Sequence, residues 1–374
     1  MTPDFAEFPT ISKEAWLNQI SKDLKDKTLD DLSWKLSEGL TVDPFAHADD
    51  FELPPLPLTT TARPWEICEN IDVANPATVN RAALDALEGG AGGLCFRLND
   101  SLDAASVAQM LEGIYLDFIG LHFAGPGVEA NPGILFSHLA QLTSAKGLKT
   151  GQLRGSLAYD PALHNTIVDW RYLADLVQFA AESFPQFAVV SVSPATTDTP
   201  VKDIVSLLQQ GNLYLEKLSE RSISPALAAA HMQFDIPIGK SYFYEIAKMR
   251  AFKLLWLHIL KAWKAPLLLP QTAVHFREEV YTDDLYTNMI RATTMAMSAV
   301  LGGADRLTVL PYDAGREAQA SYPPAFGRRI ARNVQHLLSL ESGFGEIPDP
   351  AAGSYYIEKL TRQLAAAAWR EFNA

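Results

Sequence analysis

The sequence predicts an α/β fold, a (β/α)8 TIM barrel that follows an N-terminal arm. Eight short β-rich runs occur between residues 64 and 313, and most are followed by a helical pattern. Together they fill roughly 250 residues, the usual size of such a barrel. The strands are expected at 64–72, 92–98, 117–125, 149–153, 187–193, 226–234, 266–274 and 305–313. A doubly wound open sheet is the second choice, because no G-x-G-x-x-G follows the first strand.

The segments between the strands have apolar residues three and four apart, which is typical of amphipathic helices. Asn75 and Asn131 each precede a proline, so both are expected to start a helix. A long helix is expected at 241–263. "EGGAGG" at 88–93 precedes a strand and therefore indicates a helix stop rather than a phosphate-binding loop.

Residues 1–62 are expected to form a separate arm, with the barrel at 63–374. Trp16, Ile20 and Leu24 recur every four residues and so share one side of a helix. "FELPPLPLTTTARPW" follows, and its prolines favour an extended chain. Such an arm is suited to wrapping a neighbouring domain or another subunit.

Composition excludes some classes of function. The formal charge is 31 − 44 = −13, which argues against a general nucleic-acid binder. Cys68 and Cys95 lie in apolar runs, as expected of buried thiols in a reducing cytosol. The first residues have no apolar signal region, and no run of about 18 apolar residues suggests a membrane span. A cytoplasmic protein without membrane or nucleic-acid partners is expected.

In a barrel, chemistry is expected at the carboxyl ends of the strands. The polar candidates there are Glu69, Asn70, Asp72, Arg97, Asp100, His122, Gln152, Arg154, Ser191, Ser193, His231, Gln233, Gln271, His275, Tyr312 and Asp313. His122, His231 and His275 could share a metal only if their rings converged, so polar lining or core packing is favoured. No P-loop, H-E-x-x-H, C-x-x-C or G-x-S-x-G motif is present.

Polar residues of equal parity suggest a tunnel through the barrel. Ser191 and Ser193 face one way, as do His231 and Gln233, and Gln271 is a further candidate for the lining. Barrel interiors are usually filled by branched apolar side chains, so polar ones could line a passage for an extended polar ligand. Alternatively these residues face the helices or cap loops, and the sequence leaves both interpretations open.

The chain resembles the methylmalonyl-CoA mutase family over nearly its whole length. The matching stretches are "YFYEIAKMRAFKLLW" (242–256), "DDLYTNMIRATTMAMSAVLGGADRLTV" (283–309) and "FGRRIARNVQHLLSLESGFGEIPDPAAGSYYIEKLT" (326–361), with weaker similarity in "RPWEICENID" and "FPTISKEAWLNQISKDL". The resemblance implies a (β/α)8 barrel with the CoA chain of the substrate along its axis. It also implies adenosylcobalamin on a separate C-terminal domain, and rearrangement of methylmalonyl-CoA to succinyl-CoA.

The cobalamin motif of the family, Asp-x-His-x-x-Gly, has no match in these residues. The one His-x-x-Gly is His122-Phe-Ala-Gly125, with Gly120 at the position of the Asp. We therefore expect adenosylcobalamin to serve the family complex rather than to bind this chain alone. The cobalamin domain would lie on another chain or beyond residue 374.

The resemblance also places substitutions at the family's active-site positions. "SVS" is followed by Pro194, Ala195 and Thr196, where catalytic members have Gly-Tyr-His. Asn70 stands where they have Tyr, Arg154 where they have Gln, and His164 where they have Arg. Those Tyr and His residues would bind the thioester carbonyl, and the Arg would pair with the substrate carboxylate. Their joint loss predicts a barrel with no catalytic residues of its own.

Three functions fit these substitutions. The leading hypothesis is a small, non-catalytic subunit that stabilises a large catalytic mutase subunit in a heterodimer. The second is a mutase barrel for a different acyl-CoA, with the cobalamin domain supplied in trans. The third is a free-standing acyl-CoA-binding protein.

Overall fold

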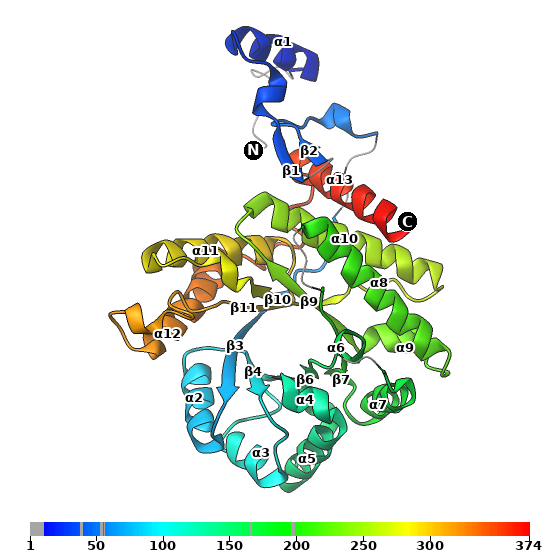
Figure 1. The fold of residues 1–374 in the computed structure, drawn as a ribbon, viewed down its shortest axis with the longest axis vertical. Helices are drawn as coiled ribbons and strands as arrows, with labels where there is room; N and C mark the ends of the chain where they lie inside the picture. The colour runs from blue at the N-terminus through cyan, green and yellow to red at the C-terminus, as the bar shows by residue number, and fades with distance from the viewer. Residues whose placement is uncertain (1–10, 38–39, 53–54, 56, 165–166, 196–198) are drawn as a thin grey trace, which may run out of the picture.

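The computed structural model describes residues 11–374 apart from 38–39, 53–54, 56, 165–166 and 196–198. Its main sheet is parallel, with the strand order β7-β6-β5-β4-β3-β11-β10-β9-β8. The strands are β3 Glu66–Val73, β4 Gly93–Leu98, β5 Gly120–Ala124, β6 Arg154–Leu157, β7 Gln186–Ala188, β8 Val190–Val192, β9 Met232–Ile238, β10 Gln271–Phe276 and β11 Arg306–Thr308. They surround a central space, with helices on the outside (Figure 1).

The sheet closes because its fifth barrel strand divides at Val189. The first half, β7, pairs with β6, and the second half, β8, pairs with β9. The Val189 amide donates to the His231 carbonyl over 2.8 Å, so the chain changes neighbours without leaving the wall. Counted as one strand, β7 and β8 complete an eight-stranded barrel, which confirms the fold predicted from the sequence.

Helices follow most strands, as a (β/α)8 barrel requires. They are α2 Pro76–Glu88, α3 Ala104–Met110, α4 Pro126–Ala130, α5 Pro132–Ala145, α6 Pro161–His164, α7 Trp170–Ser183, α8 Pro200–Ser219, α9 Pro225–Ala230, α10 Tyr242–Ala262, α11 Leu285–Leu301, α12 Pro324–His336 and α13 Tyr355–Phe372. Short helical turns are η3 Thr150–Gln152, η4 Glu278–Val280, η5 Glu317–Gln319 and η6 Leu337–Glu341. In the described part of the chain, no helix is both long and apolar enough to cross a membrane.

Two expected helix starts and the long helix agree with the structure. Asn131 caps α5, with its Oδ1 accepting from the Ile134 amide at 3.1 Å. The helix after Asn75 begins at Pro76. The expected 241–263 helix is α10, whose Arg250 is buried and pairs with Asp349 and Glu358.

The arm contains more than the helix and extended chain expected of it. Its elements are α1 Lys13–Asp23, η1 Leu29–Leu32, β1 Trp34–Ser37, β2 Leu40–Val42 and η2 Ala48–Asp50. α1 lies at the end of the molecule beyond α10 and α13 (Figure 1). Trp16 stacks on Phe45, with ring centroids 4.1 Å apart, and Lys359 of α13 binds Asp43 at 2.6 Å. After α1 ends at Asp23, the chain passes through η1 into the hairpin of β1 and β2.

The fourth strand was predicted too early, at 149–153. Residues 150–152 form a turn in which the Gln152 side chain accepts from the Lys149 amide at 2.9 Å. The Leu153 amide then donates to the Thr150 carbonyl, so the strand starts only at Arg154. Arg154 therefore lies at the amino end of its strand and not at the carboxyl end.

The sixth and seventh strands were also predicted too early. Residues 225–230 form α9 because Ser224 caps it and Pro225 occupies its first turn, so β9 begins at Met232. Pro266 and Pro270 lie in the loop before β10, which begins at Gln271. Consequently His231, Gln233 and Gln271 lie at the amino ends of their strands.

Candidate functional site: the barrel lumen

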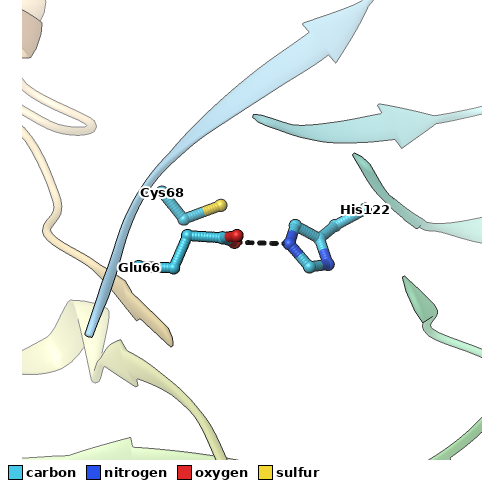
Figure 2. A group of neighbouring side chains, drawn as sticks. All are labelled: Glu66, Cys68 and His122. Carbon is cyan, nitrogen blue, oxygen red and sulfur yellow. Dashed lines mark hydrogen bonds and ion pairs between the residues drawn. The ribbon is translucent and has the colours of Figure 1, made fainter. Parts of the chain in front are cut away.

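A hydrogen-bonded network crosses the lumen near the amino ends of the strands. Glu66 of β3 accepts from His122 Nε2 of β5 at 2.6 Å (Figure 2). His122 Nδ1 lies 2.8 Å from Ser156 Oγ of β6. Arg306 of β11 reaches across to both, donating from Nη1 to Ser156 Oγ at 2.9 Å and contacting His122 Nδ1. Arg154 Nε lies 3.8 Å from Glu66 Oε2. We call these five residues the septum.

The charges of the septum follow from its surroundings. Burial, together with the Arg306 guanidinium, lowers the pKa of His122 to about 4, so this ring is neutral at pH 7. Burial acts to raise the pKa of Glu66, but the hydrogen bond from His122 and the nearby arginines outweigh it and lower the pKa. A neutral His122 that donates from Nε2 satisfies Glu66 and leaves Nδ1 as an acceptor. With Glu66 negative and two arginines positive, the septum carries one net positive charge.

Glu66, Cys68 and His122 resemble a metal site in spacing only. Their potential ligand atoms lie within 4.8 Å of one another (Figure 2). Both His122 nitrogens are already engaged, and the Arg306 guanidinium contacts the ring. Burial raises the pKa of the Cys68 thiol far above its ordinary value, which disfavours the thiolate that a metal needs. These donors therefore suit the hydrogen-bonded network better than a cation.

The septum separates two cavities. The upper one, towards the carboxyl ends of the strands, has about 560 Å³ and is bordered by His122, Ser156 and Arg306 from below. The lower one has about 420 Å³ and is bordered by Glu66 and Arg154. The Glu66 carboxylate fits here because the facing positions on β4 and β5 are Gly93 and Gly120, where any Cβ would collide with it. The network thus divides the lumen near the amino ends of the strands, whereas the sequence left an open tunnel as one of two interpretations.

Three of the predicted lining residues come together around Asp235. Ser191 Oγ donates to Asp235 Oδ2 at 2.6 Å, Ser193 Oγ donates to the same oxygen at 3.1 Å, and Gln233 Nε2 donates to Ser191 Oγ at 3.0 Å. Ser191 and Ser193, which have equal parity, do share a face, whereas the parity of His231 and Gln233 did not apply because His231 precedes β9. Asp235, the acceptor that joins the two serines, was missed because the predicted strand stopped at 234.

The other two predicted lining residues lie elsewhere. The Nδ1 atom of His231 lies 2.6 Å from the Phe187 carbonyl, and the ring is buried at the end of α9, where burial lowers its pKa. Gln271 borders a separate cavity of about 500 Å³, which residues of the arm also line. Both residues remain predictions as ligand-binding groups, but neither borders the upper cavity.

The substituted active-site positions surround the carboxyl end of the barrel, except for one. Asn70 and Ala195 border the upper cavity, and the Ala195 amide donates to Ser206 Oγ at 3.0 Å. His164 borders a neighbouring cavity of about 370 Å³, with its Nε2 3.9 Å from Glu129 Oε1. Arg154 lies below, in the septum. Thr196 lies outside the described residues.

Asp160 holds the loop that follows β8. This fully buried carboxylate accepts from the Tyr214 hydroxyl at 2.6 Å, from Gln210 Nε2 at 2.8 Å and from the Ser193 amide at 2.9 Å. Burial raises its pKa to about 6, although the hydrogen bonds act to lower it. Asp160 follows β6 in a run whose predicted strand ended too early, so the sequence did not single it out.

Residues 101–374 match the family described as Methylmalonyl-CoA mutase. The Methylmalonyl-CoA mutase small subunit of Porphyromonas gingivalis is 31% identical, over 98% of this chain and 63% of the relative. The small subunit of Streptomyces virginiae is 30% identical, over 98% of this chain and 64% of the relative. The mitochondrial mutase of Homo sapiens is 26% identical, over 96% of this chain and 54% of the relative.

The chain spans less than two thirds of the length of these relatives. Among solved structures, Yersinia pestis DHPS with a pterine-sulfa conjugate covers 75% of this chain and 94% of its own, at 12% identity and a TM-score of 0.39. A Type I 3-dehydroquinate dehydratase from Clostridium difficile covers 74% of this chain and 93% of its own, at 13% identity and a TM-score of 0.33. These scores are too low to bear on fold or function.

Proposed function

Since the chain belongs to the methylmalonyl-CoA mutase family, we propose that it is a non-catalytic, small-subunit-like component that stabilises a large catalytic subunit. The septum is the observation that carries the proposal. In this family the CoA chain of the substrate lies along the barrel axis, and here that path is closed by Glu66, His122 and Arg306. To thread a CoA chain, the barrel would have to break the hydrogen bonds that join these three side chains.

The carboxyl end of the barrel supports the same proposal. Ala195, at the position of a catalytic tyrosine, has no side-chain hydrogen-bonding group. Asn70 is shorter than the tyrosine it replaces, and His164 lies beside Glu129, which would repel a substrate carboxylate. The groups that would orient a thioester and its acid are therefore replaced together.

The residues of this chain do not fit adenosylcobalamin. The one His-x-x-Gly sequence places its histidine, His122, inside the septum, where both ring nitrogens are engaged. That histidine cannot serve as a lower ligand to cobalt while the septum is intact. In the proposed complex the cofactor would be held by other residues.

The arm is the part of the chain that we propose for contact with the large subunit. α1 has no buried residue, and its apolar residues are only partly covered within this chain. Trp16, Leu17 and Ile20 therefore remain available to a partner on one side of the helix.

The test is reconstitution with a large mutase subunit. The purified chain, with adenosylcobalamin and methylmalonyl-CoA, should form no succinyl-CoA. Added to the large subunit, it should form a one-to-one complex on size-exclusion chromatography and lengthen the half-life of activity at elevated temperature. The variant Trp16→Ala should weaken the complex, whereas Tyr115→Ala, an exposed aromatic outside the arm, should not. Turnover by the isolated chain would contradict the non-catalytic role, and absence of a complex would contradict the stabilising one.

A further inference from the structure

The upper cavity holds two opposite charges that do not meet. Asp235 of β9 is level with Ala273 of β10, and Ala273 is level with Arg306 of β11. Strands are about 4.8 Å apart, so the Cα atoms of Asp235 and Arg306 are roughly 10 Å apart. At this level the wall between them carries the Ala273 methyl group, and His275, two residues further along β10, borders the same cavity. In the described part of the chain no ion pair within 4.0 Å joins the two side chains.

Each of the two charged groups has unused hydrogen-bonding capacity on the cavity side. Asp235 Oδ2 accepts from two serine hydroxyls, while no described residue donates to Oδ1. Arg306 uses Nη1 in the septum, and no described residue accepts from its Nε or Nη2. Asp235, Ala273 and Arg306 all border the upper cavity of about 560 Å³. A ligand with an anionic group at one end and a donor at the other would complete both sets of hydrogen bonds.

The net charges select the kind of ligand. The septum below carries one net positive charge, and Asp235 contributes one negative charge on the wall. The other charged residues that border the cavity are two arginines and two carboxylates, Arg97, Arg277, Asp203 and Glu279, and together they add no net charge. A ligand with only a negative charge would be attracted by Arg306 but repelled by Asp235. A ligand with only a positive charge would be attracted by Asp235 but repelled by Arg306. From this we propose that the upper cavity binds a small amino acid as its zwitterion, with the carboxylate on Arg306 and the ammonium on Asp235. This site is independent of the proposed subunit role, because it needs neither a partner nor a CoA thioester.

The experiment is calorimetry on the full chain at low salt. The probes are glycine, β-alanine and γ-aminobutyrate, with propionate and propylamine as single-charge analogues. At least one amino acid should bind with a Kd between micromolar and millimolar, and both analogues should bind at least tenfold more weakly. The chain length that binds best reports the gap between the two charges.

Variants separate the site from general effects. Ala273→Leu fills the gap without changing charge and should abolish binding, with circular dichroism to verify folding. Asp235→Asn should weaken the amino acid at least tenfold while leaving propionate unchanged or tighter. Lys217→Gln, at the end of α8 and outside this cavity, is the control and should change Kd less than twofold. The proposal is overturned if no amino acid binds, if propionate binds as well as the amino acid, or if folded Ala273→Leu still binds. Binding of propionyl-CoA that Ala273→Leu removes would overturn it too, and would also contradict the closed lumen.

Discussion

Glu66 and His122 are 56 residues apart in sequence, yet the barrel places them in a 2.6 Å hydrogen bond. The neutral imidazole is essential to this arrangement. A second proton on His122 would turn its Nδ1 into a donor facing the Arg306 guanidinium. The same low-dielectric setting that strengthens the hydrogen bonds therefore makes the septum sensitive to acid.

His122 should make the protein less stable as the pH falls from about 6.5 to 4. Its pKa in the folded chain is about 4, below the ordinary 6.5, so the unfolded chain takes up the proton first. This difference in pKa between the folded and the unfolded chain corresponds to about 3 kcal/mol of unfolding free energy once the pH has passed both values. His122→Gln keeps a donor for Glu66 and an acceptor for Ser156 but cannot titrate. The free energy of unfolding of the wild type minus that of the variant, measured by urea denaturation, should rise by about that amount from pH 4 to 6.5. A difference that does not vary with pH would contradict a buried, neutral His122.

Asp160, in contrast to His122, should make the protein less stable as the pH rises. Its folded pKa of about 6 lies above the ordinary 3.8, so its contribution to stability is complete below pH 3.8 and is lost as the pH rises through 6. For Asp160→Asn, the wild-type minus variant difference should fall by about 3 kcal/mol over that range. The carboxyl carbon signal of Asp160 in an NMR titration gives the pKa directly, and a midpoint near 4 would refute the effect of burial.

At the residue scale, parity predicted part of the site. Ser191 and Ser193 do cluster, because alternate residues of a strand share a face whatever its exact ends. Glu66 and Arg306 were not predicted as a pair. Each is the first residue of its strand, and a charge at that position is equally typical of a solvated strand end.

At the element scale, the order of strands and helices was predictable, while several boundaries were not. Strand runs were recognised by β-branched and apolar content, which cannot separate a strand from the short helix before it. "ALAAAH" was assigned to a strand, although the Ser224 cap and Pro225 favour a helix there. This single error moved His231 and Gln233 from one end of the barrel to the other.

Helix caps give an element-scale prediction. Asn131→Ala removes the acceptor for the Ile134 amide at the start of α5 and should lower the free energy of unfolding by about 1 kcal/mol. Ser137→Ala lies on the exposed side of the same helix and should not destabilise the protein, because alanine favours helices. Equal losses in both variants would show that the cap contributes nothing specific. Thermal denaturation monitored by circular dichroism measures both.

At the scale of the whole molecule, one buried cluster of ion pairs around Arg250 connects the barrel to the arm. Arg250 of α10 binds Glu358 of α13 at 2.6 Å and also contacts Asp349. The other oxygen of Asp349 accepts from the Leu58 amide of the arm at 2.7 Å. The guanidinium thus holds a helix pair and the last part of the arm together.

Removing that guanidinium should loosen the arm as well as the fold. Arg250→Met leaves two buried carboxylates without their cation and should cost about 3–5 kcal/mol of unfolding free energy. Limited proteolysis should then cut near residues 57–63 much faster than in the wild type. Lys359→Met breaks the more exposed pair with Asp43 and should cost under about 1 kcal/mol. If the two variants behave alike, Arg250 does not anchor the arm.

Val189 gives the barrel a seam at the middle of the chain. On one side of it, β3 to β7 form a continuous ladder built from the first half of the sequence, and on the other, β8 to β11 form a ladder built from the second half. The halves are otherwise joined by the pairing of β3 with β11. Opening the wall at Val189 would break the 2.9 Å hydrogen bond from the Ser191 amide to the Tyr159 carbonyl, which lies across the seam, but would leave every strand pairing of the described sheet intact. We therefore expect the barrel wall to open locally at this seam with fewer broken hydrogen bonds than between paired strands. Hydrogen–deuterium exchange of the backbone amides should begin there.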